Sequence, residues 1–288
     1  MCQDARVTRV AVTGGSGKLG RAVVQELFDH GYEVVNLDIA GPPANTFTRV
    51  DLTDYGQTLE ALTAIDSRYR GIDAVVHLAA IPGPGAAPNA ITFQRNVTSS
   101  YNVFAAAKAA GIRNVVWASS ETLLGLPLDI PPDYIPLDEE HPPRPESSYA
   151  LGKLMDETMA AQFCRWDPSL KMIGLRFSNV MEIADYANFP SFDEDPSLRK
   201  WNLWGYIDAR DGAQAVRCAL EYDAIGLEIF VIANADTVMS QPSASLAALS
   251  FSDVPVTRQL VGTETLLSIE KARRLLGYEP RHSWRNHV

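Results

Sequence analysis

Cysteine and histidine are scarce in this chain of 288 residues, which contains three of the first and five of the second. The cysteines, Cys2, Cys164 and Cys218, lie at no spacing typical of a metal or redox centre, and the histidines form no HxxxH pair. We therefore expect no metal site, and we expect thiols that stay reduced, as they do in the cytoplasm.

Long apolar runs and basic clusters are also missing. No apolar run approaches the roughly 18 residues of a membrane-spanning helix, and the first residues lack the order of a secretory signal. Lys and Arg total 25 against 35 Asp and Glu, a net charge of -10 that argues against a general nucleic-acid binder. With 46% hydrophobic residues the chain can bury a sizeable core. We expect a cytoplasmic protein whose partner is a small molecule, not a membrane or a nucleic acid.

Glycine, by contrast, is concentrated near the start, in the stretch VTGGSGKLGR at residues 12–21. An ATP-binding phosphate loop needs Gly, four residues and Gly-Lys-Ser/Thr, but here Leu follows the Gly-Lys pair and Val stands at the first glycine position. The stretch does match Gly15-x-Gly17-x-x-Gly20. It also matches Gly14-x-x-Gly17-x-x-Gly20, which starts one residue earlier. This spacing is typical of a turn that holds a dinucleotide.

The residues around this turn support the same interpretation. Residues 9–13 form an apolar strand pattern, and apolar residues from Leu19 to Phe28 recur at helical spacing. A second apolar strand pattern at residues 33–37 ends at Asp38. The glycines let backbone amides at a helix start approach a pyrophosphate, and the acid can accept hydrogen bonds from the adenosine ribose. Because an acid there repels a 2'-phosphate, we predict NAD rather than NADP as the cofactor.

Strands and helices continue to alternate along the chain, and the strands are continuously apolar, as in a parallel sheet covered on both faces. Further strands are expected at residues 46–50, 74–78, 114–118, 171–177 and 229–232, and further helices through 59–65 and at 89–110, 147–166, 208–221 and 268–276. The predicted fold is α/β, a doubly wound Rossmann parallel sheet with a small C-terminal substrate-binding lobe. We assign residues 1–180 to the NAD-binding domain, with 205–235 returning to the sheet, and residues 181–204 and 236–288 to the lobe.

Small and polar residues follow these strands, at the edge of the sheet where ligands bind in such folds. The third strand ends at Asp51-Leu52, where the adenine amino group could be received, and the fourth ends at Leu78-Ala79-Ala80, where small residues let the cofactor pass. The fifth and sixth strands end at Ser119-Ser120 and Ser178-Asn179.

A reactive group is predicted by the stretch SSYALGK, which places Tyr149 and Lys153 one helical turn apart on one face. Removing the proton of a secondary alcohol needs a base, and an ammonium about 4 Å from a phenol favours the phenolate by roughly 4 kcal/mol at an effective dielectric of about 20. Ser120 can bind the same substrate oxygen and stabilise alkoxide character as a hydride leaves. We predict Tyr149 as the general base, Lys153 as its electrostatic partner and Ser120 as the orienting group.

Together these residues resemble an extended short-chain dehydrogenase/reductase of the NAD-dependent epimerase/dehydratase family, over nearly the full length. The matching motifs are Thr13-Gly14-Gly15-x-Gly17-x-x-Gly20, Asp38, Asp51-Leu52, His77-Leu78-Ala79-Ala80, Asn96, Ser119-Ser120, Tyr149-x-x-x-Lys153, Leu175-Arg176-Phe177-x-Asn179, Tyr206-Ile207-Asp208-x-x-Asp211 and Ser268-Ile269-x-Lys271-Ala272-x-x-x-Leu276-Gly277. The resemblance implies catalysis by Ser120, Tyr149 and Lys153, and a homodimer formed through the helices near 89–110 and 147–166. The implied NAD-binding residues are Gly14, Gly17, Lys18, Leu19, Gly20, Asp38, Asp51, Leu52, Leu78, Ala79, Ala80, Asn96, Tyr149 and Lys153, with Ser119 and Asn179 on the substrate side.

Two departures from the family pattern narrow the reaction. Dehydratases carry Thr-Asp-Glu where this chain has Ser120-Glu121-Thr122, so the second acid is replaced by a hydroxyl and dehydration is disfavoured. The segment between Asn179 and Tyr206 is short for a nucleotide-sugar enzyme, and the chain also resembles the compact uronate dehydrogenases. Arg176, Arg199, Lys200 or Arg210 could receive a substrate carboxylate, and Trp201 or Trp204 could stack on a sugar ring, although structural roles are the simpler interpretation of each.

The leading hypothesis is therefore an NAD-dependent enzyme that transfers hydride between NAD and a secondary alcohol of a sugar or sugar acid, with a slight preference for a dehydrogenase. A nucleotide-sugar 4-epimerase, which returns the hydride to a transient ketone, is the first alternative. A regulator that senses NAD(H) without catalysis is the second, and the intact Ser120, Tyr149 and Lys153 count against it.

Overall fold

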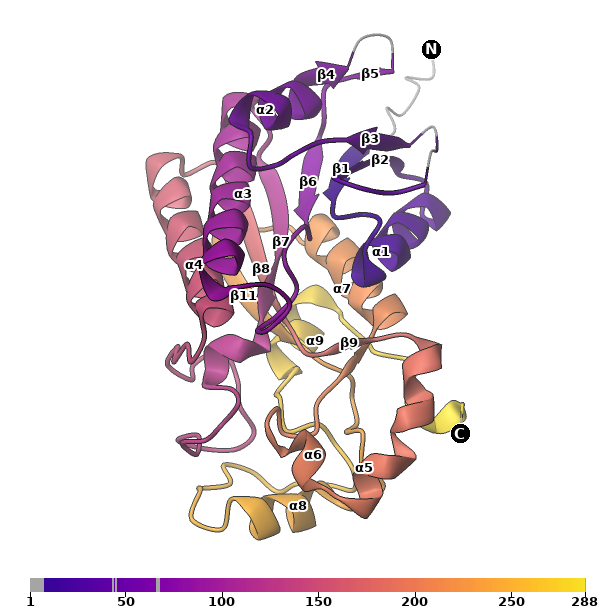
Figure 1. Cartoon of the computed structure of the whole chain (residues 1–288), viewed down its shortest axis with the longest axis vertical. Coiled ribbons are helices and arrows are strands. Elements are labelled where there is room, and N and C mark those ends of the chain that lie inside the picture. Colours follow the sequence, from indigo (N-terminus) through magenta and orange to yellow (C-terminus); the bar gives the residue numbers. More distant parts are fainter. Residues whose placement is uncertain (1–7, 43, 45, 66–67, 288) are drawn as a thin grey trace.

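The computed structural model describes residues 8–42, 44, 46–65 and 68–287. Its centre is a seven-stranded parallel sheet with the strand order β3-β2-β1-β6-β7-β8-β11 (Figure 1). The strands are β1 (Arg9–Thr13), β2 (Glu33–Asp38), β3 (Phe47–Arg49), β6 (Ala74–His77), β7 (Asn114–Ser120), β8 (Lys171–Phe177) and β11 (Gly226–Ile232). Because the chain winds from β1 to one edge and then from β6 to the other, the prediction of a doubly wound α/β fold is confirmed.

Two layers of helices enclose this sheet, with α1 and α7 on one face and α2, α3 and α4 on the other (Figure 1). Their bounds are α1 (Lys18–Asp29), α2 (Tyr55–Thr63), α3 (Asn89–Ala109), α4 (Ser148–Trp166) and α7 (Ala209–Glu221). Alternate residues of β1 serve the two layers: Val10 and Val12 pack toward α1 and α7, and Ala11 packs toward the opposite helices. Within the described ranges, no helix combines the length and the apolar character needed to cross a membrane.

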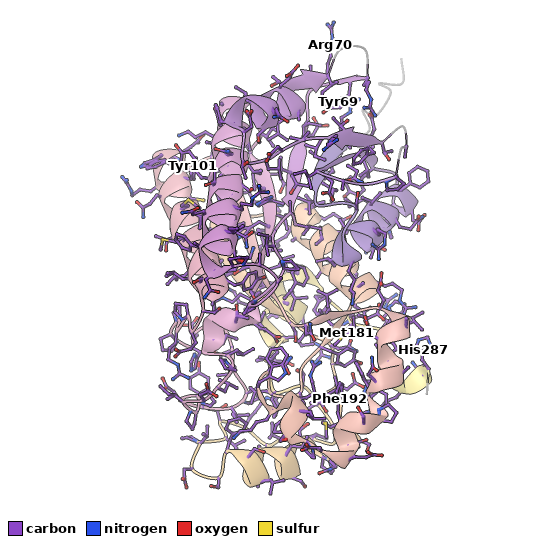
Figure 2. All side chains as sticks on the ribbon, in the orientation of Figure 1. Tyr69, Arg70, Tyr101, Met181, Phe192 and His287 are labelled. Atoms are coloured by element: carbon purple, nitrogen blue, oxygen red, sulfur yellow. The ribbon has the colours of Figure 1, made fainter. Side chains whose placement is uncertain are left out.

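Short elements and irregular segments gather beyond the carboxyl ends of the strands, mostly below the sheet in Figure 1. They are η1 (Glu121–Leu124), β9 (Val180–Met181), η2 (Ile183–Asn188), α5 (Pro190–Glu194), α6 (Ser197–Lys200), β10 (Ile207–Asp208), α8 (Ser243–Ser250), α9 (Glu270–Leu276) and η3 (Trp284–Asn286). Figure 2 shows Met181 and Phe192 among the side chains of this region. The apolar cluster against α1 and α7 continues into it through Tyr186, Trp204 and Leu246, so sheet and region share one core. The division into two domains stays a prediction.

Two elements differ from the sequence-based expectation. The helix expected to reach Ile65 ends at Thr63, because Ala64 is extended and pairs with Arg70 in a small antiparallel ladder, β4 (Ala64–Ile65) and β5 (Tyr69–Arg70). Apolar spacing alone does not reveal this pairing, since a buried residue fits either backbone. Strand β11 begins at Gly226, earlier than residue 229, because it pairs with the whole of β8.

Candidate active site

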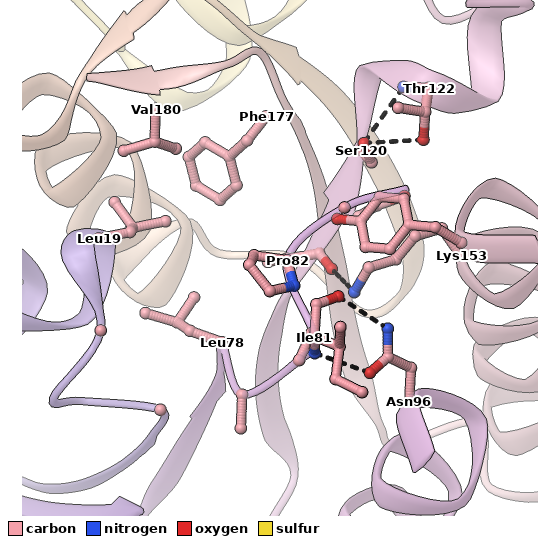
Figure 3. Close-up of a pocket in the computed structure, with 18 of the residues that line it drawn as sticks. Leu19, Leu78, Ile81, Pro82, Asn96, Ser120, Thr122, Lys153, Phe177 and Val180 are labelled. Carbon is pink, nitrogen blue, oxygen red and sulfur yellow. Dashed lines mark hydrogen bonds between the residues drawn. The ribbon is translucent and has the colours of Figure 1, made fainter. Parts of the chain in front are cut away.

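A cavity of about 1050 Å³ opens at the carboxyl ends of β1, β2, β6, β7 and β8. Every residue predicted to bind cofactor or substrate or to act in catalysis lines this cavity, with the exception of Gly20. Figure 3 shows part of its lining, with Leu19, Leu78, Phe177 and Val180 facing Ser120 and Lys153 across the space. The structure thus brings together residues that lie far apart in the chain, although no bound ligand tests the role of each.

Two glycines of the turn, Gly14 and Gly20, leave no room for a side chain. Gly14 has φ +69°, and a Cβ there would lie 2.6 Å from the backbone nitrogen of Ala79. A Cβ on Gly20 would lie 2.1 Å from the carbonyl oxygen of Gly14. The absence of a side chain at Gly20 therefore allows the start of α1 to lie close to Gly14. Gly17 begins α1 without a side-chain cap, which leaves amides of the first helical turn available to an anion. The turn therefore fits the pyrophosphate of NAD.

Two acids end neighbouring strands on the same side of the cavity. Asp38 accepts hydrogen bonds from the amides of Ser16 (3.0 Å) and Ile39 (2.7 Å), which fix its carboxylate while leaving lone pairs for ribose hydroxyls. Asp51 accepts from the hydroxyl and the amide of Thr53, and these hydrogen bonds hold the pKa of its carboxyl below its usual range. Both carboxyls are therefore placed where the adenosine part of NAD would lie.

Asn96 acts on the cavity through the loop that follows β6. Its side-chain oxygen accepts a hydrogen bond from the amide of Ile81 (2.8 Å), and its nitrogen donates to the carbonyl of the same residue (3.1 Å), as Figure 3 shows. Because both polar atoms of its side chain are engaged by Ile81, Asn96 holds the loop at this residue. Its predicted contact with the cofactor stays a prediction.

Helix α4 starts at the cavity and carries the predicted base. Ser147 caps the helix by accepting a hydrogen bond from the amide of Ala150 (3.1 Å), which places Tyr149 in the first turn and Lys153 one turn later. The Lys153 nitrogen lies 5.9 Å from the centre of the Tyr149 ring and donates to the carbonyl of Ala118 (2.7 Å). The oxygen of Ser120, on β7, accepts a hydrogen bond from the Thr122 hydroxyl (2.9 Å).

The charge of Lys153 acts on a buried polar network behind the cavity. Asp156 lies 3.4 Å from the Lys153 nitrogen, and burial raises the pKa of this carboxyl to about 6 while the lysine charge opposes the rise. Burial, assisted by the same charge, lowers the pKa of His77 to about 3, so this imidazole is neutral. His77 hydrogen-bonds the hydroxyls of Thr13 and Ser100, which lie on β1 and α3. The network therefore connects Thr13, which precedes the glycine turn, with Lys153, which lies one helical turn after the predicted base Tyr149.

Ser119 and the nearby cations have protein partners. The Ser119 hydroxyl donates to Glu157 (2.6 Å). Arg176 makes a bidentate salt bridge with the same carboxylate, in which both hydrogen bonds measure 2.9 Å. Arg210 pairs in the same manner with Asp208. Arg176 and Arg210 thus have structural roles, whereas the predicted substrate contact of Ser119 remains untested.

The two tryptophans behave differently. Trp201 lines the cavity, but Trp204 is fully buried and donates its indole N–H to the carbonyl of Pro196 (2.8 Å). Of the two, Trp201 is therefore the one placed where a sugar could be contacted.

Residues 121, 199 and 202 form a buried polar group, of which only Arg199 was considered from the sequence, as a partner for a substrate carboxylate. Glu121 is 3% exposed, lines the cavity and accepts a hydrogen bond from the Asn202 amide (3.2 Å). Burial raises its pKa to about 7, against the opposing effects of neighbouring hydrogen bonds and the charge of Arg199. The signal that could have identified it is an acid inside the otherwise apolar run that follows β7. The partners Arg199 and Asn202 lie in irregular segments and offer no such pattern.

Comparison with known proteins agrees with this geometry. The NAD dependent epimerase/dehydratase family matches residues 10–191, more than half of the chain. L-arabinose 1-dehydrogenase (NAD(P)(+)) of Haloferax volcanii is 26% identical over 284 residues, which cover 96% of this chain and 97% of that protein. UDP-glucose 4-epimerase of Mus musculus is 30% identical over 217 residues, which cover 69% of this chain and 60% of the epimerase. The chain thus spans less than two thirds of the epimerase.

Among solved structures, a mutated uronate dehydrogenase superposes with a TM-score of 0.70 at 21% identity, covering 98% of this chain and 86% of that chain. At this level of identity the likeness shows a shared fold.

Proposed function

The chain belongs to the NAD dependent epimerase/dehydratase family, and we propose that within it the protein is a dehydrogenase that oxidises a secondary alcohol of a sugar-type substrate. Relatives similar to it include both a sugar dehydrogenase and nucleotide-sugar epimerases. The chain is therefore an NAD-dependent sugar oxidoreductase or epimerase, and the choice between these reactions is the proposal.

The same cavity supports both the binding of NAD and the catalytic role that we propose. NAD would lie with its pyrophosphate on the Gly14 to Gly20 turn and its adenosine ribose against Asp38. The nicotinamide would then point toward Ser120, Tyr149 and Lys153, because these residues line the remaining part of the cavity. The observation that carries the proposal is this shared cavity, in which a dinucleotide turn and a Ser/Tyr/Lys group face one space.

The chemistry follows from the positions of the three side chains. The phenolate oxygen of Tyr149 takes the proton of the substrate hydroxyl, while Ser120 hydrogen-bonds the same oxygen and orients it. Lys153 places its ammonium 5.9 Å from the centre of the Tyr149 ring and is held there by the Ala118 carbonyl. NAD, when bound, supplies the acceptor for the hydride that leaves the carbinol carbon. Proton and hydride together convert the alcohol to a carbonyl.

Two observations favour release of NADH over epimerisation. The chain aligns with 97% of the arabinose dehydrogenase but 60% of the epimerase, so the lengths fit the dehydrogenase better. The short segment from Asn179 to Tyr206 offers less protein to hold a nucleoside diphosphate.

The epimerase remains the alternative within the family, because it uses the same base and cofactor. A sensor of NAD(H) without catalysis is the alternative from another class. The buried and ordered environment of Lys153 counts against it, since a sensor does not need this costly arrangement.

One assay separates these possibilities. Purified protein with NAD is mixed with free aldoses, uronic acids and UDP-sugars, NADH is followed by its near-ultraviolet absorbance, and product stereochemistry is determined in parallel. We expect stoichiometric NADH from a free sugar. Inverted product without net NADH would establish the epimerase, and NAD binding without turnover across the panel would leave the sensor.

We also propose a cytoplasmic homodimer. Helices α3 and α4 lie on one side of the sheet (Figure 1), and Figure 2 labels Tyr101 on α3. The two helices expose the large apolar residues Ile91, Tyr101, Leu151 and Trp166. An apolar helical face of this kind fits burial against a second copy. Cys164 and Cys218 are unpaired, which fits a reducing compartment. Light scattering of the purified protein tests the dimer.

A further inference from the structure

One part of the cavity near Ser120 is lined by acidic residues and by no lysine or arginine. We call it the substrate end and define it by its lining residues within 119–122, 126–127, 146–147, 177–180 and 201. The charged side chains among these are Glu121 and Glu146. Any charged substituent of a ligand placed here would therefore meet carboxyl groups first.

The cations near the substrate end are already committed to protein partners. Arg144 lies 3.5 Å from Glu146 and donates to the carbonyls of Ile130 and Pro131. The nitrogen of Lys153 is held by the carbonyl of Ala118. Arg176 forms its bidentate salt bridge with Glu157, as described above. Each of these cations is therefore held in place by a contact within the protein.

Arg199 is also engaged, and its contact orients Asn179. The guanidinium donates to the side-chain oxygen of Asn179 (3.2 Å) and to the carbonyl of Gly205 (2.7 Å). Because a guanidinium can only donate, the oxygen of Asn179 must face it, and the amide N–H₂ group is left for another acceptor. Asn179 thus presents hydrogen-bond donors to the substrate end, which it lines.

Glu121 supplies the complementary acceptor. One carboxyl oxygen is held by Asn202, whereas Oε2 is buried and makes no well-aligned hydrogen bond among the described residues; the Ser178 hydroxyl and the Asn179 amide lie near this carboxyl and lower its pKa. A buried oxygen without a well-aligned partner is unfavourable, and a hydroxyl donated by a ligand would satisfy it. The substrate end therefore offers an acceptor and a donor, and its lining also includes the aromatic residues Phe177 and Trp201.

We propose that the substrate end selects a neutral polyhydroxylated substrate, a free sugar without carboxylate or phosphate, and that Glu121 and Asn179 bind its hydroxyls. This inference rests on the proposed dehydrogenase function. A vicinal diol suits the pair, because each hydroxyl can both donate and accept a hydrogen bond. A substrate carboxylate or phosphate would lie beside the carboxyl groups of Glu121 and Glu146 and would find no Lys or Arg among the residues that line the substrate end.

The test compares substrates in matched pairs that differ only at the exocyclic carbon. Galactose is paired with galacturonate and glucose with glucuronate, and galactose 1-phosphate and UDP-galactose complete the panel. We expect kcat/KM of the neutral member to exceed that of its acid by at least roughly tenfold. Equal or better turnover of the acids, or of UDP-galactose, would overturn this inference while leaving the proposed function in place.

Failure of the proposed function has a different signature. If protein fluorescence shows that NAD binds, but no member of the panel yields NADH or inverted product, both proposals are overturned together. The wild-type comparison needs no variant, so it holds even if a substitution at the buried position impairs folding.

The Glu121→Gln variant assigns the selection to this side chain. The amide keeps the shape and can still accept from Asn202, but it removes the charge. We expect KM for the neutral sugar to rise roughly tenfold, kcat to change less, and the preference for neutral over acidic substrate to shrink. Glu279→Gln, the same change at a side chain that is 71% exposed, is the control and should alter none of these values. An unchanged preference in Glu121→Gln would remove Glu121 from the proposal.

Discussion

The two ends of the cavity are constructed from different parts of the chain. The cofactor end consists mainly of backbone, namely the Gly14 to Gly20 turn and the uncapped start of α1, with Asp38 fixed by neighbouring amides. The substrate end consists of side chains from distant segments of the chain. For example, Asn202 donates a hydrogen bond to Glu121, which lies 81 positions earlier in the sequence. A backbone site keeps one ligand across a family, whereas a side-chain site can change its ligand by substitution. The contrast predicts that changes at the two ends affect different measurements.

The largest effect should come from Tyr149→Phe, a change at the predicted base between the two ends. Removing the phenolic oxygen removes the base, so we expect turnover to fall by about a hundredfold or more while NAD binding is retained. Stopped-flow kinetics and NAD titration measure the two quantities. Near-normal turnover would remove Tyr149 from the mechanism, and lost NAD binding would contradict the separation of the two ends.

The stability of the folded chain should depend on pH through Glu121. Its pKa in the folded chain, about 7, lies above the ordinary value of 4.5, so between these values the folded chain holds a proton that the unfolded chain releases. Stability is therefore lost as pH rises from about 4.5 to 7, by roughly 3 kcal/mol in total.

Glu121→Gln removes this contribution. Urea unfolding at pH 5 and pH 8 should show a smaller loss of stability in the variant than in wild type, with Glu279→Gln as the surface control. Asp156 shifts in the same direction but is present in all three proteins, so its contribution cancels. Parallel losses in variant and wild type would show that Glu121 is ionised throughout the range.

The third effect concerns the cofactor end. In Gly20→Ala the new methyl group would meet the Gly14 carbonyl at 2.1 Å, so the turn must shift, at a cost of about 1–3 kcal/mol. NAD affinity should fall by roughly tenfold or more. Gly152→Ala is the matched control, because its Cβ would lie 3.7 Å from Val97, an ordinary contact. Unchanged NAD affinity in Gly20→Ala would contradict the assignment of the pyrophosphate to this turn.

The smallest effect is expected from Asn96→Ala, which loosens the loop between the two ends. Loss of both hydrogen bonds to Ile81 should reduce stability by about 1–2 kcal/mol and raise KM for NAD a few-fold. Asn96→Asp keeps the acceptor but not the donor and should lie between wild type and the alanine variant. Steady-state kinetics with varied NAD test the order of the three proteins.

Much of the fold and of the cofactor end could be predicted because the relevant signals are local. Gly14, Gly17 and Gly20 report a turn through their spacing, and Asp38 is identified by its place after the second strand. Tyr149 and Lys153 were predicted to share a face because four residues make about one helical turn, and α4 places them so. The predicted extension of the helix to Ile65 was wrong, because α2 ends at Thr63 and the pairing of Ala64 with Arg70 depends on a neighbouring segment.

The substrate end could not be predicted in the same way. Arg176 and Arg199 carry the same charge and were both considered as carboxylate partners, yet Glu157 engages one and Asn179 the other. Nothing in their spacing distinguishes these outcomes, because each partner lies on a different element and meets its arginine only after the sheet has formed.

By itself, the sequence determined the doubly wound sheet and the dinucleotide turn and predicted Tyr149 as the base, since apolar periodicity and short motifs act within one element or between neighbours. Only the tertiary structure decided which cations are free, which way the Asn179 amide points and that Glu121 lines the cavity with an oxygen that makes no well-aligned hydrogen bond among the described residues. Hydrogen bonds between distant segments decide these features, and their energies depend on burial that no single segment possesses.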